Sequence, residues 1–182
     1  MQAEAILGNI FANGVEGKPD YEQAVRWYRS AAEHGQPDAE FGLARLYTLG
    51  QGVPLDLEEA LRLLAAAADQ GQPKAQYTLA TMFEEGKGTS PDQARAAHYY
   101  QLSADRGLSQ AQIRLGRMLA GNKESRADRV SAYKCLMLAE SSIKESSAIR
   151  EALRKSMSQD EINEAEREVD NWRIAHPENP HP

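Results

Sequence analysis

The side chains best suited to metal binding or nucleophilic catalysis are few in this sequence. Cys135 is its only cysteine, which excludes an intramolecular disulfide and a cysteine-based zinc site. No histidine pair has the HExxH spacing or another spacing typical of metal ligands. The four histidines are His34, His98, His176 and His181. We therefore expect no metal site and no cofactor.

Other signatures of catalysis are also missing from the sequence. It contains no GxSxG motif, no P-loop and no dinucleotide-binding glycine pattern. The pairs Glu58–Glu59 and Glu84–Glu85 are adjacent in sequence, so their carboxylates diverge on a helix instead of converging on one substrate. We expect the chain not to be an enzyme.

Composition and charge exclude two further classes of protein. The 182 residues include 27 acidic and 21 basic side chains, which gives a formal net charge of −6. A protein that binds nucleic-acid backbones needs a basic face, and this balance argues against one. No apolar run approaches the roughly 18 residues that cross a bilayer. We expect an all-helical protein that neither binds nucleic acid nor inserts into a membrane.

Self-similarity at a period of 36 residues runs through most of the chain. An alanine recurs without a gap at Ala3, Ala39, Ala75 and Ala111. Such a period indicates stacked helical repeats that bury their apolar faces against one another. Other positions recur in step with the alanine: Leu7, Leu43, Leu79 and Leu115; Gly14, Gly50, Gly86 and Asn122; Asp20, Asp56, Asp92 and Asp128; Ala24, Ala60, Ala96 and Ala132.

Each repeat predicts two helices joined by a loop. In the second repeat, apolar residues recur at helical spacing over 39–49, and Gly50 then suits a left-handed cap. A loop with glycine and proline follows. Asp56 is placed to cap the second helix by accepting backbone N–H bonds, and Glu59 completes a capping-box-like pair. The fourth repeat predicts the same helix ends at its corresponding asparagine and aspartate.

This pattern resembles the Sel1-like repeat, a relative of the tetratricopeptide repeat. The motif reads A-x3-L-G/A-x2-Φ-x2-G, where Φ is aromatic, then D-x3-A-x2-W/L/Y and A-A-x2-G. The resemblance implies an all-α, right-handed superhelical solenoid of helix–turn–helix repeats with a C-terminal helical cap. We place the four repeats at residues 3–38, 39–74, 75–110 and 111–142.

The fourth repeat departs from the motif as the end of a solenoid would. Glu140 replaces the second alanine of the A-A pair, and Ile143 replaces the final glycine. We infer that no standard fifth repeat follows. Ser158 and Glu161 predict a capping box that opens the last helix, whose apolar residues share one face. We place capping helices at 143–176 and a flexible tail at 177–182.

The resemblance also carries an expectation about function. Members of the family mostly act as adaptors in signalling, quality control and bacterial envelope or host interactions. We expect a non-catalytic bacterial scaffold that binds a partner peptide or protein segment on its concave face. A remote alternative is a hydrolase of cell-wall or β-lactam compounds, by analogy with the cysteine-rich branch of the family. The disulfide-forming cysteines of that branch are absent here.

Analogy with tetratricopeptide arrays places one face of each first helix on the concave side. Aromatic and arginine side chains on that face are the types enriched at binding hot spots, and the arginines would meet acidic groups of the partner. The alternative is that Phe41 and Tyr77 only pack within their own repeats. The expected partner-binding residues are Phe41, Arg45, Thr48, Lys74, Tyr77, Thr81, Ile113 and Arg117.

The N-terminal helix suggests a second hypothesis about function. Ile6, Leu7, Ile10 and Phe11 are all apolar, and no capping device precedes them. Either upstream residues are missing or this end packs on another copy, which would make the chain a self-assembling structural module. No secretion signal is visible in the chain. Because upstream residues could have been removed, the bacterial periplasm and cytoplasm both stay open as compartments.

Overall fold

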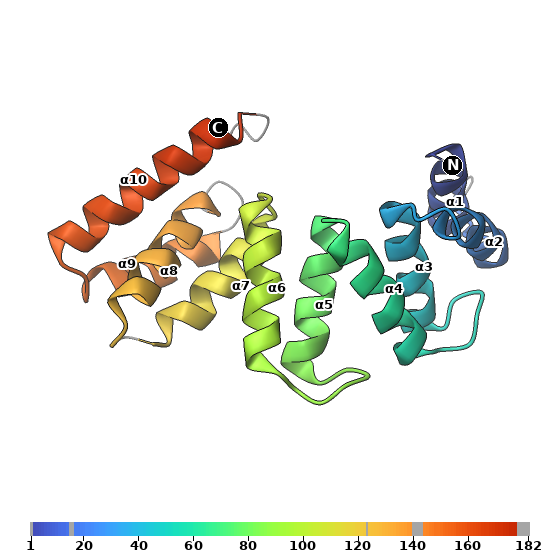
Figure 1. The fold of residues 1–182 in the computed structure, drawn as a ribbon, viewed down its shortest axis with the longest axis horizontal. Helices are drawn as coiled ribbons and strands as arrows, with labels where there is room; N and C mark the ends of the chain where they lie inside the picture. The colour runs from blue at the N-terminus through green and yellow to red at the C-terminus, as the bar shows by residue number, and fades with distance from the viewer. Residues whose placement is uncertain (1, 15–16, 123, 140–143, 178–182) are drawn as a thin grey trace. The chain divides into compact units, whose positions relative to one another are not determined.

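The computed structural model describes residues 2–14, 17–122, 124–139 and 144–177, and its regular elements are all helices (Figure 1). This confirms the all-α prediction. None of these helices is long and apolar enough to span a bilayer. The helices of the described chain are α1 (Gln2–Asn13), α2 (Tyr21–Ala32), α3 (Pro37–Leu49), α4 (Leu57–Asp69), α5 (Pro73–Glu85), α6 (Gln93–Asp105), α7 (Ser109–Ala120), α8 (Arg126–Leu138), α9 (Lys144–Arg154) and α10 (Gln159–Ala175).

The chain divides into two compact units, Met1–Tyr99 and Tyr100–Pro182, and the division falls inside α6. In the N-terminal unit, α1 pairs with α2 and α3 with α4, and consecutive pairs join where α2 meets α3 and α4 meets α5. In the C-terminal unit, α7 pairs with α8, which also packs against α9 and α10. Helices therefore follow one another in sequential pairs, as a helical repeat requires.

The aspartate of the first three repeats caps the second helix, as predicted. Asp56 accepts the backbone N–H groups of Glu58 at 3.1 Å and Glu59 at 3.0 Å. Asp20 and Asp92 accept the equivalent N–H three residues further on. The Glu59 carboxylate, however, forms a bidentate pair with Arg62 at 2.8 and 2.7 Å and is not the reciprocal half of a capping box.

The fourth repeat corrects the prediction for both of its helix ends. Helix α8 is capped by Ser125, which accepts the backbone N–H of Asp128 at 3.1 Å, so Asp128 lies inside the first turn. The helix thus begins three residues earlier in the repeat than α4 does. At the end of α7 the C-cap is Gly121 with φ −67°, whereas Gly50 ends α3 with φ +64°.

Small residues let the helices of neighbouring repeats approach closely. The alanine that recurs in each second helix is fully buried in all four repeats. In the first repeat the buried ring of Tyr28 passes over Gly42 of the next first helix, where an added Cβ would lie only 2.5 Å from the ring. Tyr28 also covers Gly8 of its own repeat. The ring therefore fits only because both facing positions lack a side chain.

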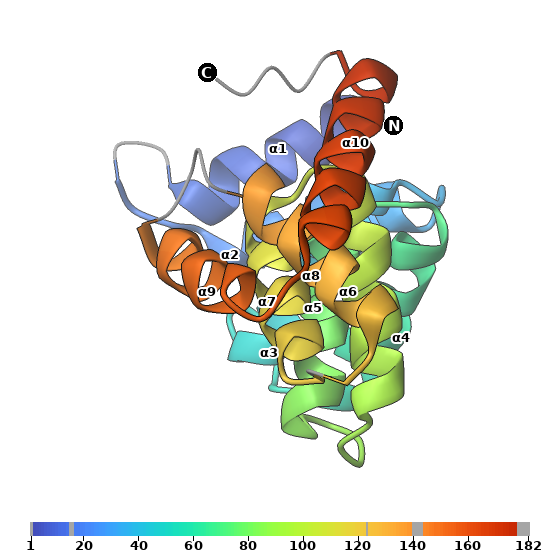
Figure 2. The same cartoon turned by 90° about the vertical axis from the view of Figure 1, so that its left-hand side faces the viewer.

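Helix α10 docks on the C-terminal unit by its apolar face, which confirms the predicted face of the last helix. It lies along α8 (Figures 1 and 2). Ile162 and Ala165 join the core that α8 forms with Leu153 of α9. Val169 and Trp172 pack against Leu138, and the Trp172 indole N–H donates to the backbone carbonyl of Asp105 at 3.1 Å.

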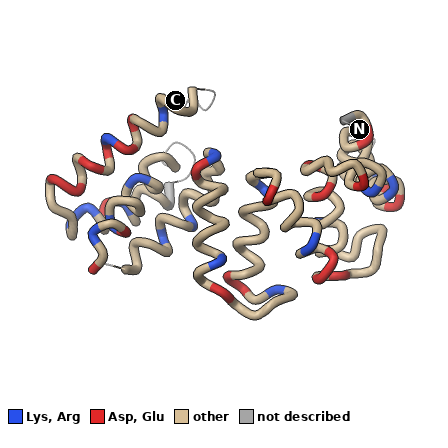
Figure 3. The backbone as a smooth tube through the Cα atoms, in the orientation of Figure 1, with Lys and Arg blue, Asp and Glu red and all other residues tan. Residues whose placement is uncertain are grey.

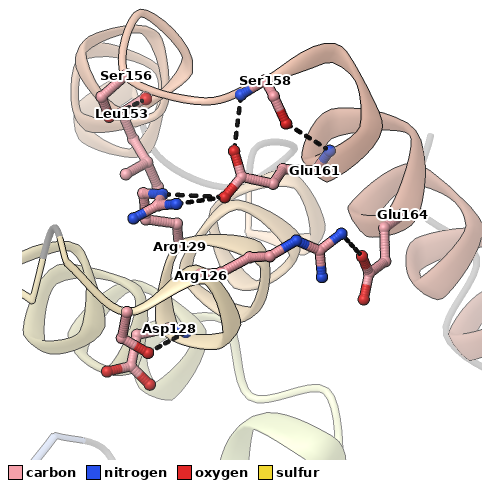
Figure 4. Close-up of polar contacts among 9 residues, drawn as sticks. Arg126, Asp128, Arg129, Leu153, Ser156, Ser158, Glu161 and Glu164 are labelled. Carbon is pink, nitrogen blue, oxygen red and sulfur yellow. Dashed lines mark hydrogen bonds and ion pairs between the residues drawn. The ribbon is translucent and has the colours of Figure 1, made fainter.

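Charges at the start of α10 reinforce this docking. The predicted capping box is present, with Ser158 accepting the N–H of Glu161 and the Glu161 carboxylate accepting the N–H of Ser158 (Figure 4). Arg129 of α8 donates to the same carboxylate. The Ser158 N–H and the Arg129 guanidinium together hold the pKa of Glu161 below its ordinary value.

The early start of α8 places a second arginine beside α10. Arg126 lies in the added turn of α8 and pairs with Glu164 (Figure 4). Farther along, Lys134 pairs with Glu168 at 3.1 Å. Acidic residues run along α10 (Figure 3), and three of them therefore meet cations of α8. The predicted departures at Glu140 and Ile143, and the tail 178–182, lie outside the described residues.

Candidate functional site

The sulfur and imidazole groups singled out by the sequence lie in structural positions. Burial raises the pKa of the Cys135 thiol to about 12, and its side chain is 2% exposed, so this thiol is buried and protonated. His34 contacts the carbonyl of Ser30 through Nδ1 at 2.8 Å. His176 stacks on the Trp172 ring with centroids 4.3 Å apart. Among the described residues no group of three or more His, Cys, Asp or Glu could hold a metal ion.

The predicted partner-binding face of the N-terminal unit carries two exposed cations beside two half-buried aromatic rings. Arg45 and Lys74 are exposed, and Phe41 and Tyr77 are half-buried. The threonines contribute less than the sequence suggests, because the hydroxyl of Thr48 donates to Ala44 O at 2.8 Å and that of Thr81 to Tyr77 O at 2.9 Å. These bonds return to the helix that bears them.

Arg45 also lines a small polar pocket between α1, α2 and α3. The pocket has a volume of about 70 Å³, and Asn9, Tyr28 and Gln51 are among its lining residues. The Tyr28 hydroxyl donates to Asn9 Oδ1 at 2.8 Å. Burial raises the pKa of Tyr28, while the positive charge of Arg45 acts in the opposite direction. The hydroxyl therefore stays protonated, and the described residues that line the pocket present a guanidinium and no carboxylate.

The two remaining predicted residues belong to the C-terminal unit. Ile113 is 5% exposed and is part of the core of α7, so it offers no surface to a partner. Ile113 shares the register of Phe41 and Tyr77 in the repeat, but its side chain is buried. Arg117 is exposed, in the last turn of α7.

Sequence reasoning overlooked a second polar position in each first helix, directly after the recurring alanine. In the third and fourth repeats it holds a fully buried glutamine, Gln76 or Gln112. In the second repeat it holds Glu40, which is only 7% exposed and lines a cleft between α2, α3 and α4. Aligning the repeats would have revealed this position, because a carboxylate stands in the second repeat where the third and fourth have an amide.

Comparisons with known proteins agree with this architecture. A model of the Sel1 repeat matches residues 2–36, 37–72, 73–108 and 109–139. The crystal structure of a Sel1 repeat protein from Oxalobacter formigenes is similar with 27% identity and a TM-score of 0.72, over 96% of this chain and 73% of that chain. A search of the curated proteins found no match.

A second solved structure supports the fold of this chain and nothing beyond the fold. It is that of c5321, a protective antigen present in uropathogenic Escherichia coli strains, which displays an SLR fold. The identity is 24% and the TM-score is 0.53, over 95% of this chain and 45% of that chain. Both similar structures are therefore helical-repeat proteins of bacteria.

Proposed function

This chain belongs to the Sel1 repeat family, and we propose that it is a non-catalytic interaction scaffold that binds a segment of a partner protein. Repeat arrays present long surfaces built from equivalent helices, which suits them to extended ligands. The binding surface in this proposal is the face of α3 and α5 that bears Phe41, Arg45, Lys74 and Tyr77 in the N-terminal unit.

The observation that carries the proposal is the environment of Arg45. Its guanidinium is exposed, lines the polar pocket with Tyr28 and Asn9, and has no ion-pair partner among the described residues. A guanidinium in such a place suits a carboxylate, which it can hold through two parallel N–H bonds. Phe41, four residues earlier on the same helix, offers apolar area beside it. We therefore expect partner segments that combine an acidic residue with an apolar one.

A displayed library of random peptides tests this specificity directly. Peptides selected by the wild-type chain should be enriched in aspartate or glutamate next to an apolar residue. Each selected peptide should bind the Arg45→Glu variant tenfold or more weakly, because the substitution places like charges together. Arg26→Glu makes the same charge change on the exposed surface of α2, outside the pocket, and should leave binding unchanged.

The alternative results would point elsewhere. Peptides that bind both arginine variants equally would show that the first-helix face is not the binding surface. The substitution Phe41→Ala then distinguishes the two roles proposed for this aromatic side chain, partner contact and packing within its repeat. If Phe41 only packs within its repeat, the variant loses stability and keeps its relative affinity for the selected peptides. If it contacts the ligand, affinity falls at conditions where both proteins are fully folded by circular dichroism.

Self-association is the second candidate function, and one observation favours it. On α1, Ile6 is 54% exposed and Ile10 is 45% exposed. Exposed apolar side chains that share one helix face are typical of protein–protein contacts. Sedimentation velocity over a concentration series would show a dimer that the double substitution Ile6→Glu and Ile10→Glu removes. A wild-type chain that stays monomeric at all concentrations would exclude this function.

A further inference from the structure

The position directly after the recurring alanine makes the same contact in the third and fourth repeats. Gln76 Nε2 donates to the carbonyl of Ala68 at 3.0 Å, and Gln112 Nε2 donates to the carbonyl of Ala104 at 3.2 Å. In each case the buried amide adds a bond to a carbonyl at the end of the preceding helix, and that carbonyl also accepts the backbone N–H of Gly71 or Gly107 at 2.9 Å. In the third and fourth repeats this position therefore holds a side chain that donates a hydrogen bond to the preceding helix.

The second repeat has a carboxylate at this position in place of the amide. Glu40 occupies the same place, and an ionised carboxylate can only accept hydrogen bonds. The equivalent carbonyl of Ala32 accepts the backbone N–H of Gly35 at 2.9 Å, as the carbonyls of the later repeats accept theirs, and an ionised Glu40 adds no second bond to it. Glu40 itself receives one bond, from Gln70 Nε2 to Oε2 at 2.8 Å, and Oε1 accepts none among the described residues. Burial raises the pKa of Glu40, because the charged form is poorly solvated there.

The carboxylate opens into a cleft of about 320 Å³ in the N-terminal unit. Its walls include Leu43 of α3 and Leu63 of α4, which are apolar, and the ring of Tyr47. Glu33 and Glu59 are acidic residues of the same cleft. The two arginines that line it have other partners, since Arg62 is held by Glu59 and Arg29 donates to the Tyr47 hydroxyl at 3.1 Å. The lining therefore carries one negative charge more than positive charges.

We propose that this cleft binds the guanidinium group of an arginine side chain from a partner, with Glu40 as its acceptor. A guanidinium matches a carboxylate in geometry and is more weakly hydrated than an ammonium, so it enters a half-closed site at lower cost. The methylene stem of the arginine lies along Leu43 and Leu63. This site lies on a different face of α3 from Arg45 and has the opposite charge, so it does not depend on the proposed function.

The test uses blocked arginine, N-acetyl-arginine methylamide, as the probe and the full chain labelled with ¹⁵N. Titration to millimolar concentrations should shift amide resonances of α2, α3 and α4 that surround Glu40. The citrulline analogue has the same shape without the charge and should leave those resonances in place. Glu40→Gln should weaken the binding of blocked arginine at least tenfold. This variant carries the side chain of the later repeats, so it keeps the fold.

A further variant separates the proposal from an internal ion pair. The charge of Arg62 lowers the pKa of Glu40 and so opposes the effect of burial. The alternative to our proposal is therefore that Glu40 serves as an internal ion-pair partner of Arg62. Under our proposal, Arg62→Ala leaves the affinity for blocked arginine unchanged or higher. An Arg62→Ala variant that no longer binds blocked arginine overturns the proposal. Equal binding to wild type and Glu40→Gln, shifts confined to other helices, or no shifts at all would also overturn it.

Discussion

At the scale of single residues, comparing Glu40 with Gln76 shows which properties of this position come from its hydrogen bonds and which from its charge. The two side chains have nearly the same size and shape, and they occupy equivalent positions of consecutive repeats. Gln76 bonds to the end of the preceding helix, whereas Glu40 lines a cleft and has a raised pKa. Replacing one by the other changes hydrogen bonding and charge without changing volume.

Glu40→Gln should stabilise the chain, and by more at neutral pH than in acid. The new amide can donate to the Ala32 carbonyl, a bond worth about 1 kcal/mol that does not depend on pH. The charge contributes separately. Because the folded state holds the Glu40 proton more tightly than the unfolded state, wild-type stability falls as pH rises from the ordinary pKa of 4.5 through the raised value.

Urea unfolding of both proteins across this pH range measures the two contributions. The stability gained by Glu40→Gln should be largest above the raised pKa and should shrink toward the pH-independent part below 4.5. An equal gain at every pH would mean that the folded chain does not disfavour the charged form of Glu40. The measurement needs no ligand and is independent of arginine binding.

Residues with a repeated role could be predicted from the sequence, and residues with a single role could not. Cys135 occupies the same place in its repeat as Leu63, which is also buried, so the repeat pattern is enough to predict its burial. The burial of Glu40 needed the preceding helix pair to be in place, because a carboxylate by itself predicts an exposed position. Arg45 was correctly expected at the surface, but the pocket that it lines depends on Tyr28 crossing from another helix.

At the scale of helices, the aspartate caps are the devices that set where each second helix begins. Asp56→Ala should destabilise the chain by about 1 kcal/mol, since two backbone N–H groups of α4 lose their acceptor. Asp69→Ala removes an aspartate from the other end of α4, where its charge opposes the helix dipole, and should be neutral or slightly stabilising. Equal losses from the two substitutions in urea unfolding would contradict the capping role.

Helix boundaries could be predicted where every repeat uses the same device and not where the array ends. The repeat pattern placed a cap at Asp128, but α8 begins after Ser125. Two features favour the earlier start: the Ser125 hydroxyl accepts an N–H of the first turn, and the added turn brings Arg126 to Glu164. The second feature lies in α10, 38 residues away in sequence, so no local pattern reveals it.

At the scale of the whole molecule, the 36-residue period accounts for the order and pairing of the helices. It could not predict how the last two helices pack, because they have no counterpart in the other repeats. Helix α9 packs against α7 and α8, and α10 packs on α8, with the Trp172 side chain reaching the carbonyl of Asp105. Each compact unit thus closes a core of its own, and repeat contacts are largely between neighbours.

This organisation predicts that damage to the C-terminal unit stays within it. Trp172→Ala removes a buried indole from the contact of α10 with α8, and should cost about 3–5 kcal/mol in that unit. Hydrogen exchange should then show lost protection in α8 and α10 and unchanged protection in α1 to α4. Arg173→Ala, next to it on the exposed side of α10, should change neither unit. If Trp172→Ala lowers protection equally in α1 to α4, the two compact units unfold as one, and the cores close together rather than separately.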